Sequence, residues 1–141
     1  MREILFRGKR VDTGEWVYGY LAKFRNYKNE MYSAIIPKDE ETGEAYMEDS
    51  HPVIPETIGQ YTGVKDKNNI KIFDGDIIFD KPPMNIYSYV GTVMWDEGRG
   101  AWRFLIHKHP EYVAYLATYG VEYTISGNIY DTPEKKQWFG Y

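Results

Sequence analysis

Short runs in which apolar and polar side chains alternate dominate this chain, and they predict a mainly β protein. The alternation is clearest at 16–24, where aromatic side chains occupy every second position from Trp16 to Tyr20. A period of two is typical of a strand with one face against a core. Turn residues such as the Asp-Thr-Gly-Glu run at 12–15 separate the first two strands and predict antiparallel pairing, and the Asp-Lys-Asn-Asn run at 66–69 predicts a further turn. Strands are expected at 4–11, 16–24, 31–36, 76–80, 89–95, 102–107 and 123–130.

Two segments have helical features instead. Within 109–120 the apolar residues recur at helical spacing, with Pro110 suited to the first position and Gly120 to the C-terminal cap. The run Asp131-Thr132-Pro133-Glu134 repeats the signals of a helix start. The pattern therefore predicts one helix inserted after the strand at 102–107 and one short C-terminal helix.

The strand pattern also predicts which side chains form the core. Each member of the predicted set is a large side chain on a strand whose apolar positions alternate with polar ones, and such positions face the interior. The predicted core residues are Phe6, Trp16, Ile77, Val93 and Ile125.

Composition limits the class of protein. The 141 residues are 43% hydrophobic and carry a formal net charge of −4, which fits a single folded domain. The chain has no cysteine, so disulfides, thiolate nucleophiles and cysteine-ligated metals are excluded. No apolar run approaches the ~20 residues of a membrane-spanning helix. The charged residues at the start are not followed by the apolar region that a signal peptide requires. A cytoplasmic protein without a membrane partner is the expectation.

Residues 38–50 hold the negative charge of the chain. This segment has one basic and six acidic side chains, a net −5, and few β-branched residues. Such a composition predicts a solvated loop or hairpin tip. An acidic calcium-binding loop is disfavoured because the carboxylates lack the alternating spacing and terminal glutamate of that motif.

One stretch resembles a known protein family in both order and spacing. It reads PETIGQYTGVKDKN from Pro55 to Asn68 and continues as IFDGDII from Ile72 to Ile78. The opening MREI and the ISGNIY run at 125–130 extend the match over nearly the whole chain. This pattern resembles the YopX family of phage and prophage proteins. Asn69 departs from it, because the family usually has glycine in that turn, and Phe73-Asp74 stands where Tyr-Glu is commoner.

The resemblance implies a fold and a setting. It implies a mainly β protein with an N-terminal antiparallel meander packed on a C-terminal SH3-like barrel, in addition to the inserted and terminal helices. The chain is then one YopX-like domain over 1–141, with the meander at 1–54 and the barrel part at 55–141. A phage or prophage origin and an intracellular setting in a bacterial host are also implied. The resemblance brings no catalytic activity, cofactor or binding residue.

Candidate chemistry in the sequence is sparse. His107 and His109 could share one strand face and chelate a metal with Glu111 or His51, but two histidines at this spacing arise easily by chance. The paired carboxylates in Asp74-Gly75-Asp76 could serve acid–base catalysis, although the same residues suit a tight turn. No serine lies in a nucleophile-elbow context. The expectation is a protein that is not an enzyme, with no metal and no cofactor.

Binding roles have better support. Small barrels bind single-stranded nucleic acid through exposed aromatic rings above basic grooves, and adjoining predicted strands offer Trp95, Trp102, Arg103 and Lys108. A basic first strand adds to this set, through Arg2, Arg7, Lys9 and Arg10. However, the isoelectric point near 5.4 is far from the basic value expected of such proteins.

Protein association is the leading hypothesis. Fourteen tyrosines supply rigid amphipathic contact area, and unpaired strand edges favour self-association into a homo-oligomer. On the predicted helix, Tyr112 and Tyr119 share one stripe, whereas Tyr115 lies about 60° away and is the candidate interface residue. The sequence thus predicts a non-enzymatic accessory protein that contacts copies of itself or a host protein. A nucleic-acid-binding module is the alternative.

Overall fold

The computed structural model describes residues 3–81, 89–117 and 121–131. The chain divides into two compact units, Met1–Tyr61 and Thr62–Tyr141. Strand β5 (Gly59–Lys65) begins in the first unit and continues into the second.

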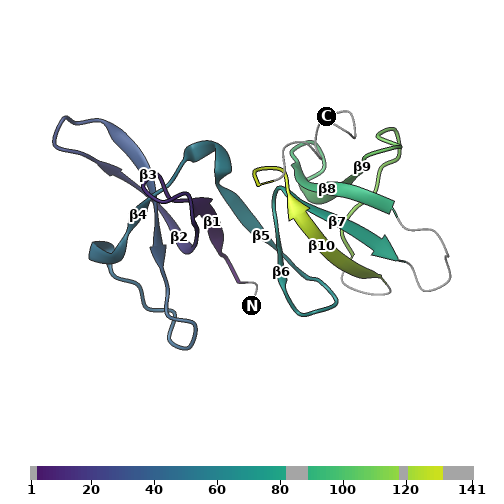
Figure 1. The fold of residues 1–141 in the computed structure, drawn as a ribbon, viewed down its shortest axis with the longest axis horizontal. Helices are drawn as coiled ribbons and strands as arrows, with labels where there is room; N and C mark the ends of the chain where they lie inside the picture. The colour runs from purple at the N-terminus through teal and green to yellow at the C-terminus, as the bar shows by residue number, and fades with distance from the viewer. Residues whose placement is uncertain (1–2, 82–88, 118–120, 132–141) are drawn as a thin grey trace. The chain divides into compact units, whose positions relative to one another are not determined.

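The first unit is an antiparallel meander. Its strands are β1 (Phe6–Lys9), β2 (Trp16–Arg25), β3 (Met31–Pro37) and β4 (His51–Pro52). They are neighbours in the sheet in the order in which they follow along the chain, and β5 pairs with the other side of β1 (Figure 1). Two single-turn 3₁₀ helices, η1 (Met47–Asp49) and η2 (Pro55–Thr57), flank β4. The predicted N-terminal meander is confirmed.

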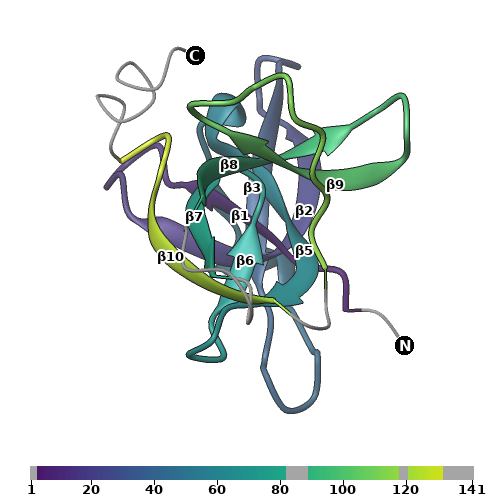
Figure 2. The same cartoon turned by 90° about the vertical axis from the view of Figure 1, so that its right-hand side faces the viewer.

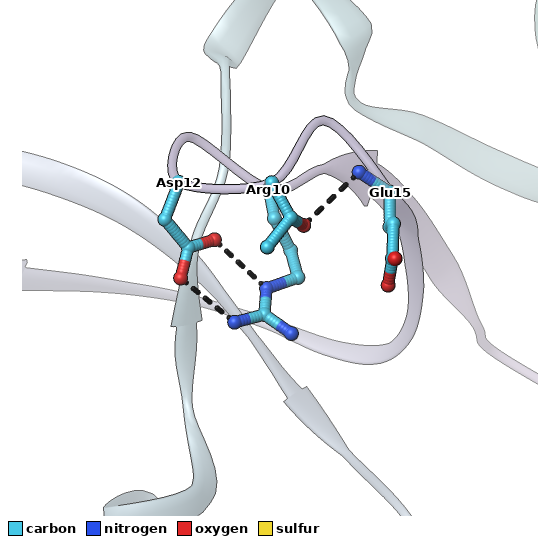
Figure 3. A network of polar contacts seen from close by, with 4 residues as sticks. Arg10, Asp12 and Glu15 are labelled. Carbon is cyan, nitrogen blue, oxygen red and sulfur yellow. Dashed lines mark hydrogen bonds and ion pairs between the residues drawn. The ribbon is translucent and has the colours of Figure 1, made fainter.

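A tight turn joins β1 to β2. The Arg10 guanidinium donates two hydrogen bonds to the Asp12 carboxylate, from Nε at 2.9 Å and from the terminal nitrogen at 2.7 Å (Figure 3). Gly14 closes the turn by donating its N–H to the Arg10 carbonyl, with φ at +75°, a conformation that glycine adopts without strain. Gly14 therefore closes the predicted turn, while the Asp12 carboxylate binds the Arg10 side chain.

The first unit has its core on one face of this sheet. Val17, Ile35 and Val53 are buried together, with Phe6 and Leu21 packed against them. Val17 and Leu21 come from alternate positions of β2, and Ile35 of β3 is the register partner of Leu21, as a two-residue period requires. The remaining positions of these strands consequently place their side chains on the opposite face of the sheet.

The second unit contains a second antiparallel sheet. Its strands are β7 (Asp76–Lys81), β8 (Tyr89–Asp96), β9 (Ala101–Ile106) and β10 (Glu122–Asn128), in the order β10-β7-β8-β9 (Figure 2). Short strand β6 (Lys71–Phe73) pairs with β5 instead. The register of β10 on β7 shifts between Ile125 and Gly127, where glycine permits the bulge. The described strands form an open sheet, so the expected SH3-like barrel is not confirmed.

The core of the second unit lies on one face of this sheet. Its most buried side chains come from all four strands and from β6, and they are Ile72, Ile78, Val93, Phe104, Ile106 and Tyr123. Of the predicted core set, Ile77 and Val93 are fully buried, which confirms those two. Phe6 and Ile125 are half-buried and pack against the two cores, so for these the prediction holds in part. Trp16 is also half-buried, but it precedes Val17 on β2 and therefore lies on the opposite face of the sheet, so its predicted place in the core is wrong.

The helix predicted over 109–120 is wrong for the described residues 109–117, which form turns and an extended segment. Phe104 donates its N–H to the Ala114 carbonyl, and Leu116 donates its N–H to the Trp102 carbonyl. Residues 114–116 thus add to the edge of β9, and this pairing satisfies backbone groups that a helix would have satisfied internally. The predicted C-terminal helix falls almost wholly on 132–141, outside the described residues.

Strands β5 and β6 were not predicted, yet the turn between them was. Asp66 accepts hydrogen bonds on Oδ1 from the N–H groups of Asn68 and Ile70, and Asn69 has φ at +66°. The β2–β3 turn repeats this arrangement, with Asn26 as acceptor and Asn29 at φ +64°. Asparagine tolerates this left-handed conformation better than most residues, which explains how Asn29 and Asn69 are accommodated in these turns.

Candidate binding surface

The second face of the first sheet carries aromatic rings. Trp16, Tyr18 and Tyr20 lie on it at alternate positions of β2. Register partners in neighbouring strands share a face, so Ile36 of β3 lies beside Tyr20, and Phe24 lies beside Tyr32. Phe24 and Tyr32 also contact each other, with ring centroids 5.8 Å apart. We call this set of rings, Trp16, Tyr18, Tyr20, Phe24 and Tyr32, the aromatic face.

Three of these rings are exposed. Tyr18 is 45% exposed, Tyr20 38% and Tyr32 36%, whereas the Val17 and Ile35 side chains that point the other way are buried. Exposed rings that lie side by side along a sheet offer more rigid amphipathic area than the same rings scattered singly. Along β2, one face of the sheet is therefore buried at Val17, whereas the other is open to solvent at Tyr18 and Tyr20.

Cations of the chain itself stack on two rings of this face. The Arg7 guanidinium carbon lies 4.5 Å from the centroid of the Trp16 ring, and the Lys9 ammonium nitrogen lies 5.6 Å from it. The Lys38 ammonium nitrogen lies 5.7 Å from the Tyr20 centroid and 3.2 Å from the Glu3 carboxylate. These distances are in the range of cation–π attraction. Rings on this face are accordingly placed to receive positive charge.

The acidic segment 38–50 contacts one end of the aromatic face. The Tyr20 hydroxyl donates a hydrogen bond to the Gly43 carbonyl at 2.9 Å, and Lys38 pairs with Ala45 across the turn. Asp39 accepts hydrogen bonds from the backbone N–H groups of Glu41 and Thr42, and these bonds lower the pKa of the Asp39 carboxyl below its ordinary value. Nearly all of 39–49 is exposed, so the predicted solvated tip is confirmed.

The two tryptophans proposed for nucleic-acid contact do lie together. Trp95 and Trp102 are register partners on β8 and β9, with ring centroids 5.1 Å apart in an edge-to-face arrangement. Trp102 packs against the core of the second unit, while Trp95 is 38% exposed at its margin. The indole N–H of Trp102 is buried and has no acceptor among the described residues. Trp102 therefore offers little surface for base stacking.

The basic members of that predicted set lie elsewhere. Arg103 follows Trp102 on β9, so its side chain projects from the opposite face of the sheet, where Met94 is its register partner. Lys108 is exposed beyond the end of β9. Tyr115, the predicted interface residue, is 37% exposed, and its backbone pairs with Arg103. Tyr112, which the sequence places on a helical stripe with Tyr119, is 51% exposed.

His107 and His109 do not form the metal site that their spacing allows. His107 is buried, and its Nε2 lies 2.7 Å from the Thr92 hydroxyl. Burial lowers the pKa of His107 to about 4, so the ring is neutral at physiological pH. His109 stacks on Tyr112 and lies 3.5 Å from the Glu111 carboxylate. Among the described residues, no group of three histidine or acidic side chains is arranged to hold a metal ion.

The carboxylates singled out in the sequence serve a turn. Asp76 is 2% exposed and accepts a hydrogen bond from the Phe73 N–H at 2.8 Å, and Gly75 between the two acids has φ at +91°. Burial also raises the pKa of Asp80 and that of Tyr123, its register partner on β10. Asp80 accepts a hydrogen bond from the Tyr89 N–H, and the Tyr123 hydroxyl accepts one from the Ala117 N–H. These contacts tie both groups to the backbone.

Sequence reasoning did not assemble the aromatic face, although its signals were present. The rings that alternate along β2 predict a strand, and the basic residues of β1 predict a basic strand beside it. These local patterns do not contain the strand register, which places Arg7 opposite Tyr18 and Lys9 opposite Trp16. Within the described ranges, no helix is long and apolar enough to cross a membrane.

Comparison with known proteins identifies the family. The family described as YopX protein matches residues 5–135. The chain belongs to the YopX family. The crystal structure of protein EF1440 from Enterococcus faecalis is similar to this YopX chain, at 22% sequence identity and a TM-score of 0.51. The similarity covers 96% of this chain and 99% of that chain, and at such identity it shows the fold alone. No curated protein matches the chain.

Proposed function

We propose that this YopX protein is a non-enzymatic binding protein that acts through protein–protein contacts made by the aromatic face. The observation that carries the proposal is the contrast between the two faces of the first sheet. One face buries Val17 and Ile35, whereas the other leaves Tyr18 and Tyr20 exposed on the same strand. Tyrosine is enriched at the centres of protein interfaces because it gives large contact area at low cost in conformational entropy.

The biological setting of this proposal follows the family. An accessory role in a phage or prophage, inside the bacterial cytoplasm, suits a small protein that binds a host protein. The titratable groups give no support to an enzyme, because Asp76, Asp80 and Tyr123 hold backbone groups and His107 holds the Thr92 hydroxyl. Self-association through Tyr115 remains a second form of the same proposal, supported by the exposure of that ring.

Nucleic-acid binding through the second sheet has less support. The alternative requires rings and cations on one surface. Trp102 and Arg103 are consecutive on β9 and project from opposite faces, and Trp102 packs against the core. The residues proposed to bind nucleic acid therefore do not share one surface.

The test is capture of proteins from a bacterial host extract by the immobilised full chain. The Tyr18→Ser/Tyr20→Ser double variant should capture fewer proteins than the wild type, because it removes exposed ring area from the aromatic face. The matched control is Tyr112→Ser, which removes a ring of similar exposure from the second unit. Identical capture by the wild type and by the double variant would refute the proposed function.

A further inference from the structure

Backbone groups on the outer side of segment 113–117 form an open edge of the second sheet. We propose that an extended segment of another protein adds to this edge as a further β-strand and places a carboxylate beside Arg103. The edge and Arg103 both lie in the second unit, so the inference does not depend on the aromatic face. It goes beyond the proposed function by assigning a second contact and the chemistry of its partner.

Segment 113–117 extends the second sheet beyond β9. The Phe104 N–H donates to the Ala114 carbonyl, and the Leu116 N–H donates to the Trp102 carbonyl. Residues 114 and 116 therefore direct these backbone groups toward β9. Successive residues of an antiparallel strand direct their backbone groups to opposite sides, so residues 113 and 115 direct theirs away from β9.

The outward backbone groups of Val113 and Tyr115 are available to a partner. Within the part of the chain that the structure describes, neither their N–H groups nor their carbonyls form a hydrogen bond. Val113 is 58% exposed and Tyr115 is 37% exposed. Beyond them, the Ala117 N–H already donates to the Tyr123 hydroxyl, which marks the end of the open edge. Exposed N–H and C=O groups at a sheet edge pair readily with an extended chain, the mode called β-augmentation.

Arg103 supplies a charge beside this edge. Arg103 and Tyr115 lie opposite each other in a pair that exchanges no hydrogen bond, and pairs of this kind bring their side chains close together. The Arg103 Nε is buried, and no described residue accepts a hydrogen bond from it. A guanidinium binds a carboxylate through strong charge-assisted hydrogen bonds, so a carboxylate is the group that Arg103 lacks.

The acidic residue nearby in the sheet register does not fill this role. Asp96 lies two residues after Met94, the register partner of Arg103, and therefore shares its face. The Asp96 carboxylate accepts the Arg99 N–H within the β8–β9 turn. Asp96 thus stabilises the turn, and among the described residues Arg103 has no ion-pair partner.

The composition of the edge favours a different protein over a second copy of this chain. Segment 113–117 reads VAYLA and has no acidic residue, so a copy paired there would bring a second Arg103 and no carboxylate. Nucleic acid is disfavoured as well, because it has no peptide groups to pair with a sheet edge. Exposed Met94 and Tyr115 flank Arg103 on its two sides, and all three residue types are enriched in protein interfaces.

The experiment measures binding of fluorescein-labelled peptides to the full-length protein by fluorescence anisotropy. Three peptides of equal length alternate threonine and valine and differ only in the central residue, which is glutamate, glutamine or lysine. The wild type should bind the glutamate peptide about two- to fivefold more tightly than the glutamine peptide, the range for one solvent-accessible ion pair. The lysine peptide should bind most weakly, because its charge repels Arg103.

The charge preference has a matched pair of variants. Arg103→Gln should bind the glutamate and glutamine peptides equally. Arg99→Gln removes the same charge from the exposed β8–β9 turn and should keep the preference of the wild type. Equal loss of the preference in both variants would overturn the proposal, because binding would then reflect bulk charge.

A second pair of variants tests the backbone pairing. Tyr115→Pro and Tyr115→Thr both lose the ring, but only proline also removes the outward N–H. Proline is tolerated at a sheet edge whose N–H faces solvent. Tyr115→Pro should bind the glutamate peptide about two- to tenfold more weakly than Tyr115→Thr, as expected for the loss of one hydrogen bond. Circular dichroism and thermal unfolding establish that each variant is folded, and the Arg103 comparison decides the matter if Tyr115→Pro is not.

Other results would overturn the inference. The absence of binding to all three peptides would show that the edge takes no added strand. Sedimentation of the protein alone as a dimer that Tyr115→Pro dissociates and Tyr115→Thr retains would assign the edge to a second copy. Tyr18→Ser/Tyr20→Ser should bind the peptides as the wild type does, so a failure of the aromatic face and a failure of this edge are distinguishable.

Discussion

The guanidinium of Arg7 on β1 packs on the Trp16 ring at the start of β2, at 4.5 Å from its centroid. Arg7 is 5% exposed, so the contact places a cation against an aromatic ring away from most of the solvent. The register sets Arg7 opposite Tyr18 and Lys9 opposite Trp16, which makes Arg7 and Trp16 diagonal neighbours on one face. Cation–π contacts gain strength when they are desolvated.

Removing the Trp16 ring should therefore destabilise the first unit. Trp16→Leu keeps apolar volume but loses the ring, and we expect a loss of about 2 kcal/mol in the free energy of unfolding. Trp16→Phe retains a weaker ring and should lose less. Urea unfolding followed by circular dichroism measures the difference. Equal stability of the two variants would show that Arg7 gains nothing from the ring.

Ile77 is fully buried on β7, and its truncation should be costly. Ile77→Ala should lower the free energy of unfolding by about 2–5 kcal/mol, since the site loses apolar burial and gains a cavity. Ile70→Ala is the matched control because Ile70 is 54% exposed. Urea midpoints of the two variants should differ clearly. A midpoint for Ile77→Ala equal to that of Ile70→Ala would contradict its place in the core.

His107 should make the protein sensitive to mild acid. Burial lowers the pKa of His107 to about 4, against an ordinary value of 6.5. Below pH 6.5 the unfolded chain binds a proton that the folded chain does not bind until pH 4, so acidification favours unfolding across this window. Above pH 6.5 both states are neutral at this residue, and the contribution is constant.

The measurement is the difference in unfolding free energy between the wild type and His107→Gln as a function of pH. This difference should change between pH 6.5 and 4 in the direction that disfavours the wild type at low pH. A difference that is flat through the window would mean that protonation of His107 costs nothing in the folded state.

The left-handed conformation of Asn69 also has a measurable cost. Asn69→Ala should destabilise the protein by about 1 kcal/mol, because alanine resists positive φ more than asparagine does. Asn69→Gly should be neutral or stabilising, since glycine adopts this φ readily. Asn29, in the matching β2–β3 turn, should respond in the same way. Chemical denaturation that ranks alanine at or above glycine would refute this account of the turn.

Self-association is tested separately through Tyr115. If the second unit forms the interface, wild-type protein should sediment as a species heavier than the 16.6 kDa chain. Tyr115→Glu should then shift the population toward monomer without unfolding it, because a charge is costly at the centre of an interface. A wild-type monomer at tens of micromolar, by analytical ultracentrifugation, would remove this form of the proposal.

Local signals in the sequence were sufficient for most strands and turns. The alternation around Trp16 to Tyr20 predicted β2, because a two-residue period is a property of the extended backbone itself. The Asp-Thr-Gly-Glu and Asp-Lys-Asn-Asn turns were predicted because Asp, Asn and Gly satisfy or permit turn geometry through their own atoms. The family was recognised from ordered motifs over nearly the whole chain.

Other features depend on contacts between residues that are distant in the sequence, so local patterns do not predict them. Residues 114–116 have a helical pattern, but hydrogen bonds to the edge of β9 hold them extended. Strands β5 and β6 lack a clear alternation, and β5 gains its conformation by pairing with β1 and β6. The sequence places Trp102 and Arg103 in one predicted site, but as consecutive residues of β9 they point to opposite faces of the sheet.

The aromatic face likewise depends both on local sequence patterns and on long-range strand pairing. The alternation of rings along β2 and of basic residues along β1 is already visible in the amino-acid order. Only the antiparallel register brought Arg7 beside Trp16, and only the Tyr20–Gly43 hydrogen bond brought the acidic tip to the margin of those rings. Periodicity is encoded locally in the chain, whereas register and face are set by which strands pair, and pairing is a long-range property.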